Sequence, residues 1–337
     1  MERQVRGEPM ADGRREDRGT RLGSWKGLIP LTVAAAAALC IGGGVDMVHR
    51  HQQGGGDDER EAKPAAKAEQ TDPRFVVGVT AGGAALVVRD VHTGADVGLP
   101  VAPPEGRRFQ RVAAVKDDGS FIVASYGDRK VTFQRLQLDD DGAPQDLKDV
   151  PEAVVPGAST AWSDIAVTED HIAYVTYAGK RSRVDVLTLS SGARKTWTTK
   201  SPGRVDSLSW SGTTLSFVWT PVGSAKHQLR TIDTSGAAGD LKLSKAVMTL
   251  PKGSSHAVLT RNGKQAVVGT VAKAQLTVQT FALTGEPAKI LWRQKVTGPL
   301  TGLDIAHTGG GVLAAAGDLY TKDVPAVPGK DLADATW

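Results

Sequence analysis

From residue 74 onward, short runs of Val, Ile, Leu and Thr alternate with segments rich in Gly, Asp and Ser. Runs of this kind are typical of β-strands joined by tight turns. Examples are RFVVGVT at 74, SFIVASY at 120, HIAYVTY at 171, TLSFVWT at 214 and QLTVQTFAL at 275. No segment after residue 45 keeps a 3.6-residue apolar period for more than two turns, which disfavours helices. The pattern predicts an all-β domain over residues 74–337.

The predicted strands recur with a long period. A unit of strand, tight turn and strand occurs five times, and its last residue before the turn recurs at intervals of 52, 43, 50 and 47 residues, at Lys116, Thr168, Ser211, Arg261 and Thr308. A second unit, a strand that ends in a hairpin with glycine, recurs in step at intervals of 48, 50, 44 and 49 residues, at Gly94, Gly142, Gly192, Gly236 and Gly285. A period of 40 to 50 residues with about four strands is typical of one propeller blade. The sequence therefore predicts a β-propeller of six four-stranded blades.

The first predicted blade begins abruptly at Arg74 and lacks a first strand. The last residues of the chain, LADATW at 332, resemble the first-strand pattern VDSLSW at 205, so that Asp334 matches Asp206 and Trp337 matches Trp210. We expect the C-terminal segment to pair with the first blade and close the ring, because closure removes two exposed sheet edges.

An uncharged segment of nineteen residues, from Gly27 to Val45, precedes the β domain. A helix needs about 20 apolar residues to cross a bilayer, so the segment is just long enough. Residues 1–26 contain seven Lys and Arg, whereas the first twelve residues after the segment contain only Arg50. The positive-inside rule then predicts a single-pass transmembrane anchor helix over residues 27–45, with the N-terminus in the cytoplasm and the propeller outside the cell membrane. A cleaved signal peptide, which would release a secreted propeller, and a lipid anchor or buried helix remain alternatives.

The segments on either side of the apolar run are rich in charged residues and glycine. We expect residues 1–26 to be a disordered basic cytoplasmic tail and residues 46–73 to be a flexible linker. Cys40 is the only cysteine, so an exported domain over residues 74–337 has no disulfide and depends on burial of its core.

Charge and motifs exclude several classes of function. Residues 73–337 contain 30 Lys and Arg against 25 Asp and Glu, spread along the chain, so no basic stripe indicates a nucleic-acid partner. Nucleophile elbows, phosphate-binding loops and zinc motifs are absent from the sequence. We therefore expect no catalytic residue, no metal and no cofactor.

Four residues are candidates for a ligand site at the mouth of the central channel: Asp164, Asp206, Asp304 and Trp210. The aspartates recur at the start of first strands, together with Asp334, where they either face the channel or accept hydrogen bonds from backbone amides. Trp162, Trp210, Trp219 and Trp292 are expected to pack between blades, and one or two of them could stack on a sugar or peptide at the channel mouth. His171 and His307 occupy the same turn region of two blades and could converge on one face.

The period and the repeated turn residues resemble the membrane-anchored or exported WD-repeat-like and TolB-like β-propellers of bacteria over residues 74–337. The chain departs from them in lacking the Gly-His and Trp-Asp dipeptides of true WD repeats and clear TolB signatures. The resemblance implies a non-enzymatic binding or scaffold module in the cell envelope, whose partner is a peptide, a cell-wall component or another envelope protein. A propeller enzyme of the lactonase or glycosidase type is the alternative. Asn262, the only asparagine, lies in an Asn-Gly turn, and the glutamates after the linker lie in turns. In such an enzyme, aspartates would therefore have to serve as the metal ligands or the catalytic carboxylates.

Overall fold

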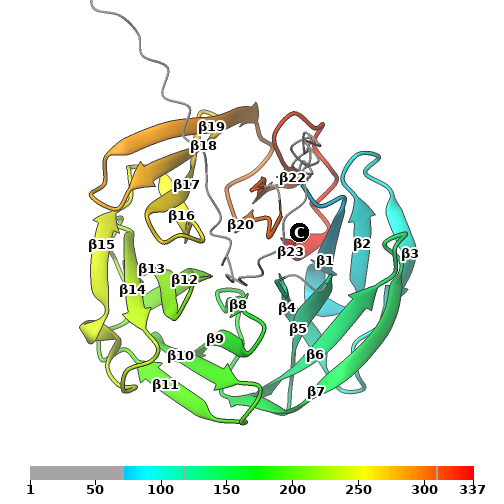
Figure 1. Ribbon diagram of the computed structural model, residues 1–337, viewed down its shortest axis with the longest axis horizontal. Helices are drawn as coiled ribbons and strands as arrows, with labels where there is room; N and C mark the ends of the chain where they lie inside the picture. The colour runs from blue at the N-terminus through cyan, green and yellow to red at the C-terminus, as the bar shows by residue number, and fades with distance from the viewer. Residues whose placement is uncertain (1–71, 117–118, 309) are drawn as a thin grey trace, which may run out of the picture. The chain divides into compact units, whose positions relative to one another are not determined.

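Six β-sheets stand around one axis in the computed structural model, which describes residues 72–116, 119–308 and 310–337 (Figure 1). The strands are β1 (Phe75–Thr80), β2 (Leu86–Asp90), β3 (Asp96–Val101), β4 (Arg108–Ala114), β5 (Ser120–Gly127), β6 (Lys130–Leu138), β7 (Pro144–Pro156), β8 (Ile165–Val167), β9 (His171–Ala178), β10 (Arg181–Thr188), β11 (Arg194–Thr198), β12 (Gly203–Ser211), β13 (Thr214–Pro221), β14 (Gln228–Asp233), β15 (Lys245–Thr249), β16 (Ser254–Leu259), β17 (Gln265–Ala272), β18 (Gln275–Ala282), β19 (Pro287–Lys295), β20 (Gly302–Ile305), β21 (Val312–Ala316), β22 (Asp318–Tyr320) and β23 (Leu332–Thr336). Two short 3-10 helices, η1 (Ala81–Gly83) and η2 (Leu241–Leu243), lie in connections.

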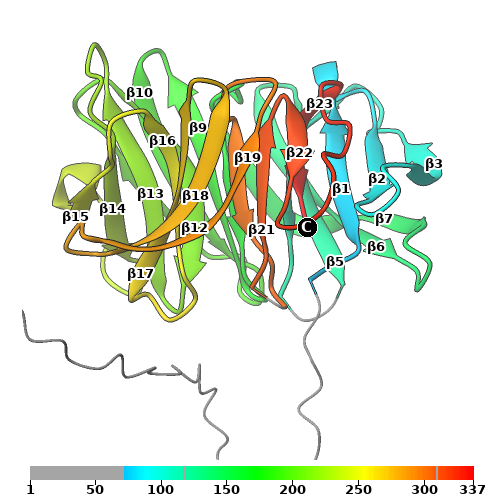
Figure 2. The ribbon, with the colours of Figure 1, turned by 90° about the horizontal axis from the view of Figure 1, so that it is seen from above.

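Each sheet is one blade of antiparallel strands. The sheet orders are β23-β1-β2-β3, β4-β5-β6-β7, β8-β9-β10-β11, β12-β13-β14-β15, β16-β17-β18-β19 and β20-β21-β22. The first strand of each order is innermost, and the strands cross the disc from one face to the other (Figures 1 and 2). The predicted all-β six-bladed propeller is confirmed.

The C-terminal strand closes the ring as the sequence predicts. Strand β23 pairs antiparallel with β1, with Val77 opposite Thr336 and Val79 opposite Asp334. It therefore supplies the inner strand that the N-terminal part of the first blade lacks.

The sixth blade corrects the expectation of four strands in every blade. Its sheet has only β20, β21 and β22, and the segment after β22 makes a single bridge between Leu319 and Val327. Pro325 and Pro328 flank this bridge and have no amide proton to donate, so a longer ladder cannot form there. The segment is fixed to blade 1 instead, where the Arg89 guanidinium donates to the Pro328 carbonyl and to both carboxylate oxygens of Asp331.

The core lies between the blades. In the described part of the chain, six clusters of buried apolar side chains each join two neighbouring blades. Some strands, such as β2 and β5, are buried on both faces, and their consecutive Val, Ile, Leu and Phe residues contribute to these clusters. Because each blade packs against both neighbours, the inner strands are held rigidly around the channel.

The predicted transmembrane helix lies outside the described residues, as do the tail over residues 1–26 and nearly all of the linker over residues 46–73. Among residues 72–116, 119–308 and 310–337, no helix has the length and apolar character that a membrane crossing requires.

Candidate functional site

The central channel contains two cavities of different chemistry. One, of about 370 Å³, is lined by the beginnings of the inner strands and the segments before them, and we call it the carboxylate end because Asp164, Asp206, Asp304 and Asp334 all line it. The other, of about 580 Å³, lies at the turns between first and second strands. We call it the apolar end because Ile165, Val167, Leu208, Val258 and Ile305 line its wall.

Three of the four recurring aspartates hold the next blade in place. Asp164, just before β8, accepts a hydrogen bond from the Leu208 amide of β12 at 2.8 Å. Asp334 in β23 accepts one from the Val112 amide of β4 at 2.9 Å. The predicted capping role of these carboxylates is therefore observed between blades.

Asp304 in β20 makes the same kind of contact across the point of closure. Its carboxylate accepts hydrogen bonds from the Thr336 hydroxyl at 2.6 Å and from the Trp337 amide at 3.2 Å. Its other oxygen accepts from the Ile305 amide. In each case a carboxyl group satisfies donors of an inner strand that has no further ladder partner.

Asp206 departs from this rule. The amide of the next blade, on Leu259, is held by the Ser209 hydroxyl at 3.0 Å, so Asp206 has no neighbouring strand to hold. One Asp206 oxygen accepts a hydrogen bond from Arg204, and the other has no partner although the residue is only 7% exposed.

A bulge beside Asp206 explains the departure. The pairing of β12 with β13 shifts register between Asp206 and Ser209, and Ser207 has a φ of +52°. Positive φ in a residue other than glycine is strained and is concentrated at functional positions. Ser207 is buried, and its hydroxyl also lacks a partner. Two adjacent buried polar groups without partners therefore line the carboxylate end.

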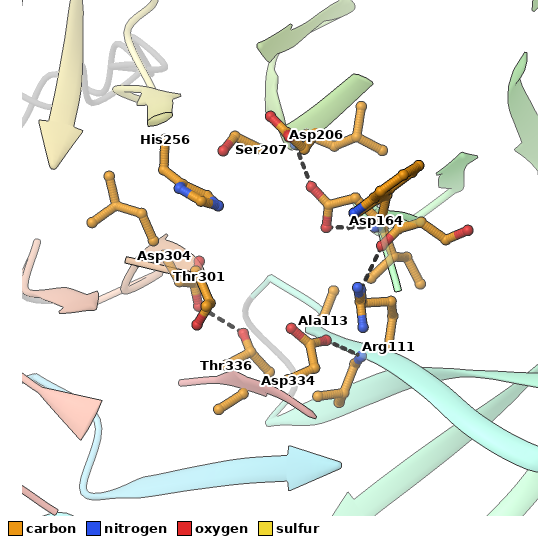
Figure 3. A pocket seen from close by; sticks show the side chains of 18 of the residues that line it. Arg111, Ala113, Asp164, Asp206, Ser207, His256, Thr301, Asp304, Asp334 and Thr336 are labelled. Carbon is orange, nitrogen blue, oxygen red and sulfur yellow. Dashed lines mark hydrogen bonds between the residues drawn. The ribbon is translucent and has the colours of Figure 1, made fainter. Parts of the chain in front are cut away.

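Arg111 and His256 occupy the channel positions in the two blades that have no such aspartate (Figure 3). The Arg111 guanidinium donates to the carbonyls of Ser163, Ala161 and Gln110. His256 is buried, and its Nδ1 lies 2.8 Å from the Ser255 hydroxyl. Figure 3 shows the side chains of all six blades around one open space.

Burial changes the proton affinity of this ring. It raises the pKa of Asp206 to about 7, with a further increase from the nearby charge of Asp164 and an opposing effect of Arg204. Burial likewise raises the pKa of Asp334 to about 7 and raises that of Asp164. His256 shifts the other way, to a pKa of about 4, because burial and the Arg204 charge disfavour the imidazolium. Near neutral pH the ring therefore has carboxyls that are partly protonated and a histidine that is neutral.

The structure brings Asp164, Asp206 and Asp304 together at the carboxylate end, whereas Trp210 lines the apolar end, which Asp304 also borders. Trp210 lines the apolar end, packs against the cluster between blades 3 and 4, and lies 5.8 Å from the His171 ring. Trp219 packs against the same cluster, and Trp292 belongs to the one between blades 5 and 6, as expected.

Trp162 does not pack between blades. It lies at the carboxylate end with 57% of its surface exposed, held edge-to-face against Tyr177. Trp162 therefore lies at the carboxylate end of the channel, and Trp210 lies at the opposite end. His307 lines that opposite end as well.

Sequence reasoning missed Arg111, Arg204, Ser207 and His256. An alignment of the inner strands by their turn residues places Arg111 and His256 at the positions that aspartates occupy in the other four blades. No group of three or more His, Cys, Asp or Glu in the described part of the chain is arranged to hold a metal ion.

No protein-family model and no curated protein matches this chain. Solved structures do resemble it in fold. TolB from Acinetobacter baumannii superposes with a TM-score of 0.52 at 12% identity, covering 77% of this chain and 65% of that one, so the chain spans just under two thirds of the TolB length. The nidogen/laminin complex gives 0.51 at 9% identity, covering 78% and 97%. A putative 6-phosphogluconolactonase from Bacteroides uniformis gives 0.44 at 13% identity, covering 76% and 93%. The similarity to TolB supports a TolB-like six-bladed propeller fold.

Proposed function

We propose that this chain is a non-catalytic binding module that takes its ligand at the carboxylate end of the channel. The observation that supports this most strongly is the pair of unpartnered groups at Asp206 and Ser207. A buried polar group without a hydrogen bond costs about 1–3 kcal/mol, so proteins retain such groups mainly where something else binds them. The ligand comes from the cell envelope: a peptide, a cell-wall component or another envelope protein.

We further propose that residues 27–45 anchor the propeller in the membrane with the domain outside. Asp72, the first described residue, accepts a hydrogen bond from the Gly311 amide in the turn between β20 and β21. That turn belongs to the face of the apolar end, at the opposite end of the inner strands from Asp206. The chain that follows the linker therefore joins the disc at this face.

Affinity capture tests the binding role. The full chain in neutral detergent is immobilised and exposed to envelope extract, next to Asp206→Asn and next to Asp140→Asn, an exposed hairpin carboxylate, as the matched control. We expect an identified component to be retained by the native chain and by Asp140→Asn, and retained at least tenfold less by Asp206→Asn. Equal retention by all three, or retention of nothing, would contradict the proposal.

Membrane extraction tests the anchor. We expect the chain to remain in the membrane fraction after alkaline carbonate treatment, with its N-terminus intact. Recovery of a soluble chain that begins near Leu39 or beyond would show a secreted propeller instead.

One observation favours the enzymatic alternative. Asp206 has a pKa near 7 and feels the charge of Asp164, a combination that suits an acid and base pair. The purified chain should nevertheless hydrolyse neither aryl glycosides nor simple lactones. Turnover that is lost in both Asp164→Asn and Asp206→Asn, but kept in Asp140→Asn, would replace the binding function by a hydrolytic one.

A further inference from the structure

The carboxylate end has buried acceptors without a partner. Arg111 directs its guanidinium to three backbone carbonyls, and the Nε of Arg204 donates to Asp206. What is left over is an Asp206 oxygen and the Ser207 hydroxyl. A donor group that enters this cavity would find hydrogen-bond partners in both.

The charges of the ring agree with this. Four carboxyl groups and two guanidiniums line the cavity, and His256 is buried. Burial leaves Asp206 and Asp334 partly protonated near neutral pH, and a cation that binds there favours their ionised forms, whereas an acidic ligand opposes them.

Trp162 adds an aromatic surface at the lip of the same cavity. Its indole is fixed by the contact with Tyr177 while more than half of the residue remains exposed. Aromatic faces bind ammonium and guanidinium groups by cation–π attraction, and tryptophan does so best.

The size of the cavity limits what it can hold. At about 370 Å³ it lies at the lower end of the range for ligand pockets, which suits one extended side chain rather than a large ligand.

We propose that the carboxylate end binds a single organic cation, the ammonium or guanidinium group of a peptide, with Asp206 and Ser207 as its acceptors and Trp162 stacked against its stem. The inference rests on the proposed binding function and names the ligand chemistry of the same site. The cation comes either from a lysine or arginine side chain or from a free N-terminus.

Proton linkage gives the site a pH signature. A bound cation favours the ionised form of a carboxyl, so binding at a group with a pKa near 7 releases protons, and affinity rises from pH 6 to pH 8. The charged and titratable groups that line the cavity with Asp206 are Arg204 on its own strand and Arg111, Asp164, His256, Asp304 and Asp334 on the other blades.

Calorimetric titration of the full chain in neutral detergent tests the inference with small capped peptides. The probes are acetyl-Gly-Lys-Gly-amide, its Gln and Glu counterparts, Gly-Gln-Gly-amide with a free N-terminus, and chitotriose as a neutral sugar. At pH 8 we expect the Lys probe, or the free N-terminus probe, to bind at least tenfold more tightly than the capped Gln probe, and the Glu probe not to bind. Which of the two cationic probes is preferred identifies the source of the cation.

Variants locate the binding. Asp206→Asn should reduce the affinity for the preferred cationic probe at least tenfold and flatten its increase between pH 6 and pH 8, while Asp140→Asn should leave both unchanged. Trp162→Ala, at an exposed position that the fold does not need, should weaken binding several-fold and keeps the test valid if Asp206→Asn is poorly folded. Affinity of both cationic probes equal to that of the capped Gln probe, or unchanged affinity in both channel variants, overturns the inference. Preference for the Glu probe or for chitotriose, if it is lost in Asp206→Asn, also overturns the inference but leaves the binding function in place. If no probe binds, the inference fails, and the capture experiment alone decides the function.

Discussion

The two ends of the channel are built from the same six strands but differ in what their side chains leave unsatisfied. At the apolar end the wall of the larger cavity is largely aliphatic, Trp210 is packed into an inter-blade cluster, and charged residues such as Lys116, Glu169 and Arg261 lie at the turns. At the carboxylate end the cavity is smaller, but it contains strain at Ser207 and an unpartnered oxygen on Asp206. The adjacent pair of unpartnered groups, Asp206 and Ser207, distinguishes the carboxylate end. At the apolar end the Trp210 Nε1 is also buried without a partner, but its ring packs into an inter-blade cluster.

The same comparison separates structural from functional aspartates. Asp164, Asp304 and Asp334 accept hydrogen bonds from the next inner strand, whereas Ser209 makes this contact in the blade of Asp206. Because Asp206 does not make the contact that the other three aspartates make, its carboxylate is available to bind a ligand.

Removal of β23 should have the largest effect, because this strand contributes to both ends. Deleting residues 332–337 opens the ring, exposes an edge of β1 and removes Asp334 and Trp337 together. We expect loss of the cooperative thermal transition in circular dichroism, whereas Trp337→Phe, which keeps the strand, should retain one. A truncated chain that unfolds cooperatively near the native temperature would show that closure is not essential.

Asp164→Asn should destabilise the fold through the carboxylate end alone. Both of its oxygens accept backbone amides, from Ile165 and Leu208, and an asparagine can accept with only one of them. We expect the free energy of unfolding in urea to fall by about 1–3 kcal/mol. Asp140→Asn should change it by less than about 0.5 kcal/mol, and equal effects of the two substitutions would contradict the structural role of Asp164.

The pH dependence of stability should change in opposite directions in two channel variants. Asp206 has a pKa of about 7 when folded and 3.8 when unfolded, so the folded state binds more protons and this group lowers stability as pH rises from 4 to 7. His256 has a pKa of about 4 when folded and 6.5 when unfolded, so it raises stability over pH 4 to 6.5.

Relative to the native chain, Asp206→Asn should therefore gain free energy of unfolding between pH 4 and 7, and His256→Gln should lose it between pH 4 and 6.5. Each slope is at most about 1.4 kcal/mol per pH unit. Urea unfolding at four pH values between 4.5 and 7.5 measures both. Parallel curves for the two variants would mean that these groups titrate alike in the folded and unfolded states.

The smallest effect is expected at the apolar end. Ala114→Val adds two methyl groups at the wall of the larger cavity, where space is available. We expect a change in stability below about 1 kcal/mol and unchanged binding of the cationic probe. Loss of binding in this variant would show that the two ends do not act separately.

The sequence predicts the fold well because a propeller repeats its turns. The spacing of Lys116, Thr168 and Ser211 gives the blades, and the match of Asp334 to Asp206 gives the closing strand. The missing fourth strand of the last blade was not predicted, although Pro325 and Pro328 are signals against it.

The site is predicted only in part, for a physical reason. The recurring aspartates identify the ring of residues at the carboxylate end. Asp206 occupies the same position in its blade as the other three aspartates, so sequence alone does not show that its hydrogen-bond partners differ from theirs. Its difference depends on the backbone of Ser207 and on the hydroxyl of Ser209, which are features of the three-dimensional arrangement. Sequence does not show that Trp210 lies at the other end of the channel from the aspartates, because this depends on its place along β12, four residues beyond Asp206.

A crystal structure of the chain with the preferred cationic probe tests the central claim most directly. The account predicts electron density for the ammonium or guanidinium group at the carboxylate end, within hydrogen-bond distance of Asp206 and Ser207, and none at the apolar end. Density at the apolar end beside Trp210, with Asp206 and Ser207 still unpartnered, would contradict it.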